Sequence, residues 1–145
     1  MTESCPVCDR PAVLGRENRE LIVEKRTVSV PHEFYRCTGC AEELFEPEQM
    51  DAVLRCAADA IRAQDGTLAP AEIAALRRTL GYTQAELETI MNTGAKTITR
   101  WERGTVAPTG PADTLLRVFL RHPEMAHELA EERGIRRGAS RRKAG

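Results

Sequence analysis

The chain of 145 residues carries 21 basic and 22 acidic side chains, and aromatic residues make up only 4% of it. This length gives room for one ordinary domain or two small ones, with cores built mainly from aliphatic side chains. No apolar run reaches the roughly 18–20 residues that span a membrane, and the N-terminus lacks the basic and apolar regions of a signal peptide. We therefore expect a cytoplasmic protein whose cysteines stay reduced.

Charge is distributed unevenly along the chain. Residues 1–66 carry a net charge of −5, residues 67–132 carry −2, and residues 133–145 contain six basic and no acidic side chains. An acidic front and a basic tail favour different partners for the two ends.

The N-terminal third combines two C-x-x-C pairs with strand and helix patterns. Between the pairs, "ELIVEKRTVSVPHEFYRC" alternates apolar and polar residues, which predicts two or three short strands interrupted at Pro31. Apolar residues then recur at helical spacing over 46–64, which predicts an amphipathic helix. The "DGTLAP" stretch that follows is typical of a linker, so residues 1–66 are expected to form one domain.

The two C-x-x-C pairs have the spacing of a structural zinc site, with ligands Cys5, Cys8, Cys37 and Cys40. Each pair can point two thiolates at one ion from a tight turn, and four thiolates leave no open position for catalysis. Gly39 is expected to give the second turn a permissive backbone. A redox motif, two disulfides or an iron–sulfur site remain alternatives without a supporting context. The three histidines sit in no ligand spacing and are expected at the surface.

From Pro70 onward the pattern is helical. Gly81 is a C-cap signal, and Thr83 with Glu86 forms a capping box. Helices are predicted over residues 70–80, 83–91, 93–104, 110–122 and 123–134. This pattern predicts an all-α domain of five helices over 67–134, followed by a basic, disordered tail over 135–145.

Residues 83–104 have the length and order of a helix-turn-helix. In its second helix Lys96, Arg100 and Arg103 recur at i, i+4 and i+7, with Thr93 and Thr97 beside them. Lys and Arg can donate to guanine in the major groove, and Thr can contact a thymine methyl group or a phosphate. This basic stripe predicts a DNA-reading helix.

The first helix of this motif begins with Thr83 and Gln84, which are expected to contact phosphates through side chains and backbone amides. We expect Trp101 in the core and Glu102 as an acceptor for a nearby arginine. A basic stripe also occurs as the ordinary solvated face of a helical bundle. The capped first helix and the "TRWERG" ending favour DNA binding over that reading.

The stretch "YTQAEL…TITRWERGTVAP" resembles the helix-turn-helix of phage-repressor-like (XRE or Cro/C1-type) proteins. Together with "CPVC", "CTGC" and "LLRVFLRHPEMAHEL", it makes the chain similar to the MqsA (YgiT-type) antitoxins over roughly residues 4–132. The resemblance implies an α+β zinc-binding domain that blocks a ribonuclease toxin, then a Cro/C1-like domain that dimerises and represses its own operon. It places one structural Zn²⁺ on the four cysteines and the base-reading positions at Lys96 and Arg100.

Three positions depart from the pattern of these families. Lys96 stands where a known member has Asn, and Lys prefers guanine where Asn prefers adenine, so the operator sequence is left open. Asn92 replaces the usual turn glycine and tolerates a left-handed backbone. Glu88 replaces a small residue between the helices, which leaves the packing there open.

The sequence therefore predicts the antitoxin of a type II toxin–antitoxin pair, acting as a homodimer on palindromic double-stranded operator DNA. The apolar face predicted to support the dimer comprises Leu115, Leu116, Val118, Phe119 and Leu129. The alternative is a stand-alone transcriptional regulator whose zinc domain binds another protein or a small-molecule signal. An enzyme is not expected, because no paired carboxylates, Ser/His/Asp set or open metal site is present.

Overall fold

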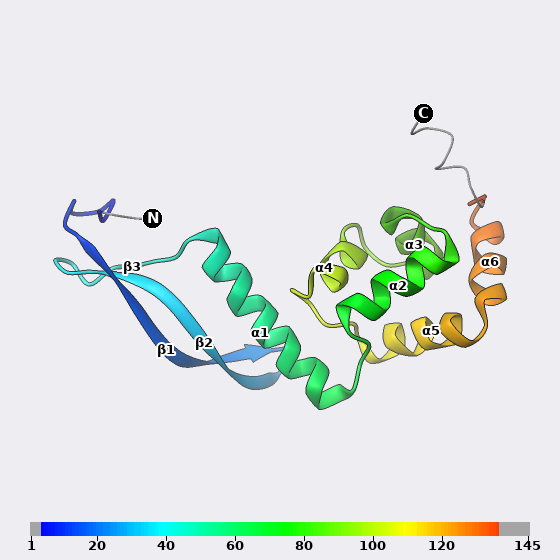
Figure 1. Ribbon diagram of the computed structural model, residues 1–145, viewed down its shortest axis with the longest axis horizontal. Helices are drawn as coiled ribbons and strands as arrows, with labels where there is room; N and C mark the ends of the chain where they lie inside the picture. The colour runs from blue at the N-terminus through cyan, green and yellow to red at the C-terminus, as the bar shows by residue number, and fades with distance from the viewer. Residues whose placement is uncertain (1–3, 137–145) are drawn as a thin grey trace. The chain divides into compact units, whose positions relative to one another are not determined.

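The structure is a computed structural model that describes residues 4–136. It divides into two compact units between Ile61 and Arg62. Figure 1 shows strands and one helix in the first unit and helices alone in the second. The predicted fold class, an α+β domain followed by an all-α domain, is confirmed.

A long hairpin dominates the first unit. Within the described residues the sheet is antiparallel in the order β1-β2-β3, and its strands are β1 (Ala12–Val23), β2 (Arg26–Cys37) and β3 (Glu43–Leu44). The two-residue turn between β1 and β2 has positive φ at both Glu24 (49°) and Lys25 (68°). Turns with this geometry match the right-handed twist of a hairpin, so two ordinary residues adopt the conformation that Asn-Gly usually supplies.

Pro31 does not interrupt the strand, contrary to the sequence-based prediction. It lies inside β2, opposite Asn18 of β1. Proline lacks an N–H, so a strand tolerates it where one edge is not paired. β3 pairs with β2 only at Tyr35 and Arg36 and leaves that edge of β2 open at Pro31.

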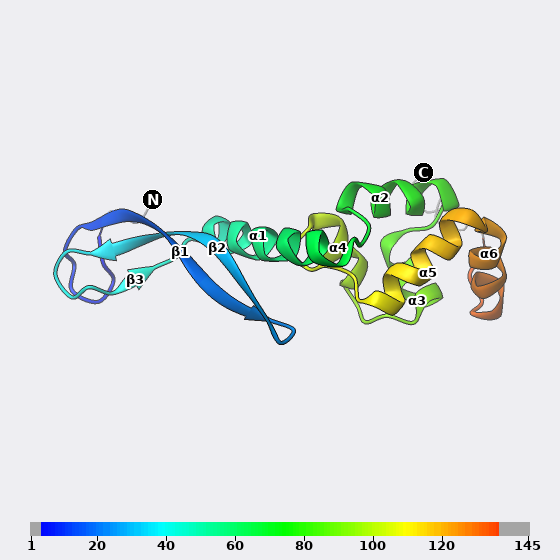
Figure 2. The ribbon, with the colours of Figure 1, turned by 90° about the horizontal axis from the view of Figure 1, so that it is seen from below.

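One face of β2 and one face of α1 (Pro47–Asp65) form the core of this unit. The buried residues are Val28, Val30, His32, Phe34, Val53, Ala57, Ala58 and Ile61. Both views draw α1 beside the hairpin (Figures 1 and 2). His32 was expected at the surface and is instead 6% exposed, with Nδ1 3.1 Å from the carbonyl oxygen of Val30. The alternation of β2 places position 32 on the buried face.

Phe34 lies at the centre of a side-chain cluster near the end of the sheet that carries the second cysteine pair. Its ring lies over Gly15, where a Cβ atom would come within 2.8 Å of it. The guanidinium groups of Arg19 and Arg36 lie 4.6 and 4.9 Å from the ring centroid, and both donate to Glu43 of β3. These hydrogen bonds lower the pKa of Glu43 to about 2. The cluster thereby fastens β3 to the hairpin.

The second unit contains the five predicted helices within the described residues. They are α2 (Pro70–Leu80), α3 (Gln84–Met91), α4 (Thr97–Arg103), α5 (Gly110–Arg121) and α6 (Pro123–Glu132). Gly81 is left-handed at the C-cap of α2, with φ 84°. The capping box of α3 is confirmed, because Thr83 Oγ1 accepts from the amide of Glu86 and Glu86 Oε2 accepts from the amide of Thr83.

The helices enclose an aliphatic core in which Ile73, Leu87, Ile98, Leu116 and Phe119 are fully buried. Ile135, at the start of the expected tail, packs against this core, and residues 137–145 lie outside the described part. Among residues 4–136, no helix combines the length and apolar character needed to cross a membrane.

A buried carboxylate anchors the segment that leads into α2. The carboxylate of Asp113 in α5 accepts hydrogen bonds from the amide of Leu68 at 2.7 Å and from Nε of Arg117 at 2.8 Å. Arg117 in turn donates to the carbonyl oxygen of Gly66 at 2.7 Å. The chain entering the helical unit is therefore held on α5.

Candidate metal centre and nucleic-acid interface

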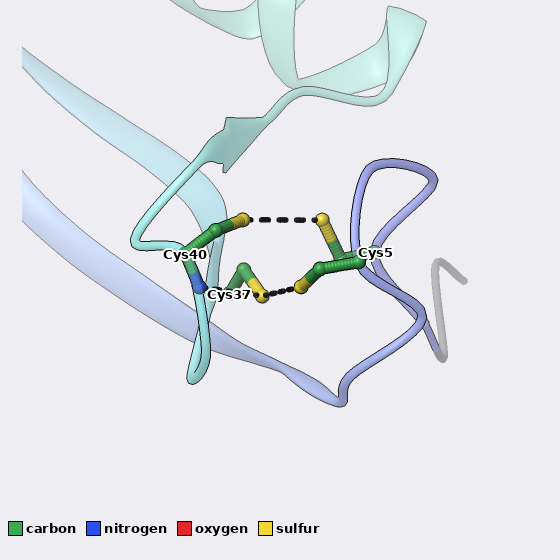
Figure 3. Close-up of side chains that lie close together, drawn as sticks. Cys5, Cys37 and Cys40 are labelled. Atoms are coloured by element: carbon green, nitrogen blue, oxygen red, sulfur yellow. Dashed lines mark hydrogen bonds between the residues drawn. The ribbon is translucent and has the colours of Figure 1, made fainter.

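The four predicted ligand cysteines lie together, with all four Sγ atoms within 4.8 Å of one another. Cys5 Sγ is 3.6 Å from Cys40 Sγ, and Cys8 Sγ is 3.3 Å from Cys37 Sγ, as Figure 3 shows for the labelled residues. A disulfide requires about 2.05 Å. Four thiolates at about 2.3 Å from one tetrahedral ion lie roughly 3.8 Å apart. The spacing therefore fits a shared metal ion and not two disulfides.

Both cysteine pairs use the same backbone turn. In each pair the amide of the first cysteine donates to the carbonyl oxygen five residues later, and its own carbonyl accepts from the amide four residues later. The residue after the second cysteine is left-handed in both turns, with φ 59° at Asp9 and 61° at Ala41. The hydrogen bonds, 2.8–3.2 Å long, join Cys5 to Arg10 and Asp9, and Cys37 to Glu42 and Ala41. The two turns thus present their thiols in equivalent ways.

Gly39 serves this site for a reason that differs from the predicted one. Its backbone is not left-handed. A Cβ atom there would instead come too close to the exposed side chain of Arg10 from the first turn, which would have to shift. Glycine at position 39 thus gives room for contact between the two turns.

Backbone amides stabilise negative charge on the sulfur atoms. Cys40 and Gly39 donate their amides to Cys37 Sγ at 3.5 and 3.3 Å and lower the pKa of this thiol to about 6. The amide of Val7 donates to Cys5 Sγ at 3.4 Å. Metal ions bind the thiolate form, so the donors at Cys37 favour the state that a metal requires at this ligand, whereas burial and the neighbouring thiols raise the pKa of Cys40 to about 12. Cys5 and Cys37 are buried and are the sheltered half of the cluster.

The helix-turn-helix consists of α3, the turn 92–96 and α4. Asn92 is left-handed with φ 55°, as expected for its place after α3. Lys96 was expected within the second helix, one turn before Arg100, but it is the N-cap of α4 and is left-handed with φ 65°. The amide of Thr97 donates to the carbonyl oxygen of Gly94, and this hydrogen bond closes the turn before α4. Lys96 therefore flanks the helix and does not continue its face.

The residues predicted to contact DNA differ in exposure and in whether their side chains already have hydrogen-bond partners. Lys96 and Arg100 are exposed, and their side chains make no hydrogen bond or ion pair with residues 4–136. Arg103 is exposed and Thr97 is half-buried, whereas the Thr93 hydroxyl donates to the carbonyl of Glu88 at 3.5 Å. Lys96 and Arg100 are thus available to a ligand.

Gln84, predicted as a phosphate contact, has its side chain engaged inside the motif. Its amide donates to Glu102 Oε2 at 2.8 Å, and its carbonyl oxygen accepts from the Thr99 hydroxyl at 2.9 Å. Gln84 therefore joins α3 to α4. The role of Thr99 has no local signal in the sequence, because its partner lies 15 residues away.

Glu102 fulfils its predicted role as an acceptor for an arginine. Arg77 of α2 donates to its two carboxylate oxygens at 2.5 and 3.1 Å, and the side chains of Arg77 and Glu102 are only 14% and 9% exposed. Although burial raises the pKa of Glu102, hydrogen bonds from Arg77 and Gln84 bring this pKa below its ordinary value. Trp101 is buried in the core, also as predicted.

Glu88 fills the space where a small residue was expected. Its side chain is buried at 9% exposure, and Oε1 accepts from the amide of Ile98 at 3.1 Å. The carboxylate thus crosses from α3 to the first turn of α4.

We expect Cys37→Ser to release the metal and unfold the hairpin unit, because the turn that carries half the ligands loses its buried thiolate. The helices α2–α6 should stay folded. Metal analysis and amide NMR spectra of the full chain measure both effects. Cys56→Ser is the matched control, since Cys56 lies outside the cluster. A Cys37→Ser protein with a full metal complement and intact β1–β2 signals contradicts the assignment.

We expect Glu102→Gln to lower the free energy of unfolding of the helical unit by about 3 kcal/mol at neutral pH, because the Arg77 charge is left buried without a charged partner. The pKa of Glu102 is lower in the folded than in the unfolded state, so its stabilisation is present above the unfolded pKa, about 4.3, and is lost as pH falls through the folded pKa. The variant should lack that part of the acid-induced loss.

Urea unfolding at a series of pH values, followed by the fluorescence of the single tryptophan Trp101, measures this effect. Glu132→Gln, which removes an exposed carboxylate, is the control. Parallel pH profiles for wild type and Glu102→Gln would contradict the prediction.

Comparison with known proteins identifies the family of this chain. The family model described as "Antitoxin component of bacterial toxin-antitoxin system, MqsA" matches residues 3–130. Antitoxin MqsA of Escherichia coli K12 is 30% identical over 129 residues, which cover 86% of this chain and 98% of that protein. Antitoxin HigA-2 of Vibrio cholerae is 33% identical over 64 residues, which cover 44% of this chain and 62% of that protein. The chain belongs to the MqsA family and is the antitoxin component of a bacterial toxin–antitoxin system.

Proposed function

We propose that this antitoxin neutralises a ribonuclease toxin through residues 1–66 and represses its own operon through residues 67–134. The observation that carries the second activity is the pair of exposed side chains Lys96 and Arg100, which have no partner among residues 4–136, on a braced helix-turn-helix. The division of the chain into two compact units supports a division of labour. The cytoplasm, where operator DNA is found and thiols stay reduced, is the proposed compartment.

The metal held by the cysteine cluster is proposed to be a single structural Zn²⁺. All four donors are sulfur, and Zn²⁺ prefers a tetrahedral shell of this kind. The ion would join the two turns at one end of the hairpin. Four protein ligands leave no coordination position for a substrate, so no catalytic activity is proposed.

Lys96, Arg100 and Thr97 are proposed to read base edges in the major groove. The ammonium group of Lys and the guanidinium group of Arg can donate hydrogen bonds to the acceptors of guanine. Thr93, Arg103 and Thr83 are proposed as contacts to the flanking phosphates. Gln84 keeps a place among the phosphate contacts through its backbone amide at the start of α3, since its side chain is held by Glu102 and Thr99.

Two copies are proposed to bind a palindromic operator, because one motif of this size reaches only one half-site. The predicted dimer face is narrower than the sequence indicated, since Leu116 and Phe119 are fully buried in the core. Leu115 and Val118 are half-buried on α5, and Leu115, like Leu129, packs partly against the core. The dimer contact is therefore proposed at Leu115 and Val118.

Arg100→Ala should weaken binding to the DNA upstream of the gene roughly a hundredfold, because a bidentate base contact is worth about 1–3 kcal/mol and a dimer makes it twice. Fluorescence anisotropy with that DNA measures the loss. Arg133→Ala, an exposed arginine at the end of the last helix, is the control. Co-expression with the neighbouring toxin gene should show unchanged growth rescue. Wild-type affinity of Arg100→Ala would show that α4 is misassigned.

Val118→Glu should convert the dimer to a monomer, since a carboxylate in an apolar contact loses its hydration. Leu120 is 56% exposed and lies two positions further along α5, on another side of the helix. Leu120→Glu should therefore remain dimeric. Light scattering of the full chain measures both. A wild-type protein that is monomeric at high concentration, or a dimeric Val118→Glu, would exclude this face.

A further inference from the structure

The reading helix α4 is short and begins without a cap of its own. It spans seven residues, and within residues 4–136 the side chain of its N-cap residue, Lys96, accepts no hydrogen bond from the helix. A lysine ammonium group has no acceptor to offer. The first amides of any helix lack partners within the helix, so an outside acceptor is needed.

Glu88 of α3 supplies that acceptor. Its Oε1 atom lies 3.1 Å from the amide nitrogen of Ile98, the second residue of α4. Its backbone carbonyl also accepts from the amide of Thr93 at 2.9 Å. One buried residue thus holds both the start and the end of the turn that leads into α4. Lys96, which lies between these two contacts, is held in its left-handed conformation.

We propose that Glu88 is the positioning residue of the DNA-reading helix: its carboxylate fixes the first turn of α4 and thereby the direction of the Lys96 side chain. The inference rests on the proposed binding of operator DNA and deepens it. Glu88 is buried, so it acts through Ile98 and Lys96 and does not touch DNA.

Loss of this contact should affect specific binding more than non-specific binding. Specific binding needs Lys96 and Arg100 held in one arrangement, and its apparent affinity falls with the fraction of molecules in that arrangement. Non-specific binding depends on the neutralisation of phosphates and not on the order of the first turn. The ratio of the two affinities is therefore the informative measurement.

Two neutral variants of similar length separate the hydrogen bond from the charge. Glu88→Gln keeps a carbonyl oxygen that can accept from Ile98, whereas Glu88→Met removes the acceptor. We expect Glu88→Met to lower the ratio of operator to non-specific affinity roughly tenfold, because the loss of the acceptor has the effect of losing a helix N-cap. Glu88→Gln should keep this ratio within about twofold. Glu128→Gln, which removes an exposed carboxylate, controls for net charge.

Hydrogen exchange reports the contact itself. The Ile98 amide should exchange faster in Glu88→Met than in Glu88→Gln, while the Leu87 amide in α3, which donates to the carbonyl of Thr83, should not change. Trp101 fluorescence checks that each variant is folded. If Glu88→Met does not fold, Glu88→Ala takes its place, and the comparison of Glu88→Gln with wild type in exchange at Ile98 still tests the contact.

A double-mutant cycle with Lys96→Ala tests the route of the effect. In the wild type, Lys96→Ala should lower the affinity ratio, and in Glu88→Met it should have little further effect, because Lys96 is already misdirected. Equal ratios for Glu88→Met and Glu88→Gln, or additive losses in the cycle, would overturn the inference. Failure of the wild type to bind the upstream DNA would instead overturn the proposed DNA binding.

Discussion

Two small units share 145 residues, so neither can rely on the size of its hydrophobic core, and polar contacts have to hold the short elements in place. In the hairpin unit the cysteine cluster closes one end. The Arg19–Glu43–Arg36 cluster fastens the two-residue strand β3 beside it. The sheet residues that lead into the second cysteine pair are thus fixed by sulfur and charge as well as by burial.

The same constraint governs the helix-turn-helix. A helix of seven residues is not stable by itself, and α4 is held by the polar side chains of three residues in neighbouring helices. Arg77 of α2 binds Glu102 at its C-terminal end, the Gln84 amide of α3 bonds to Glu102 and Thr99, and Glu88 binds the amide of Ile98 at its start. The exposed side chains of Lys96, which precedes the helix, and of Arg100 have no partners among residues 4–136. A rigid base and two exposed basic side chains fit the proposed role of α4 in binding DNA.

The braced geometry also separates residues that are proposed to contact a ligand from residues that hold others in place. Gln84 and Glu88 lie close to the basic residues in sequence, yet their side chains point into the motif and serve α4. In the metal centre, Gly39 has a comparable role, since its missing side chain leaves space for Arg10 across the second turn. Substitutions at these supporting positions would alter the sites without removing a candidate metal ligand or a proposed base contact.

Local patterns in the sequence were sufficient for the helices and for the metal cluster, but not for the length of the strands β1 and β2. Cysteine spacing, helical periodicity and the Thr83–Glu86 capping box act over a few residues, so their outcome does not depend on distant contacts. The tertiary structure decided which side chains remain free. The burial of His32, the continuation of β2 through Pro31, the engagement of Gln84 and the cap by Glu88 depend on partners in other elements or on sheet edges. The pairs Gln84–Glu102 and Glu88–Ile98 are separated by 18 and 10 residues. Periodicity carries no information about such pairs, because it places a residue on a face of its own helix and not opposite a particular group on the next one.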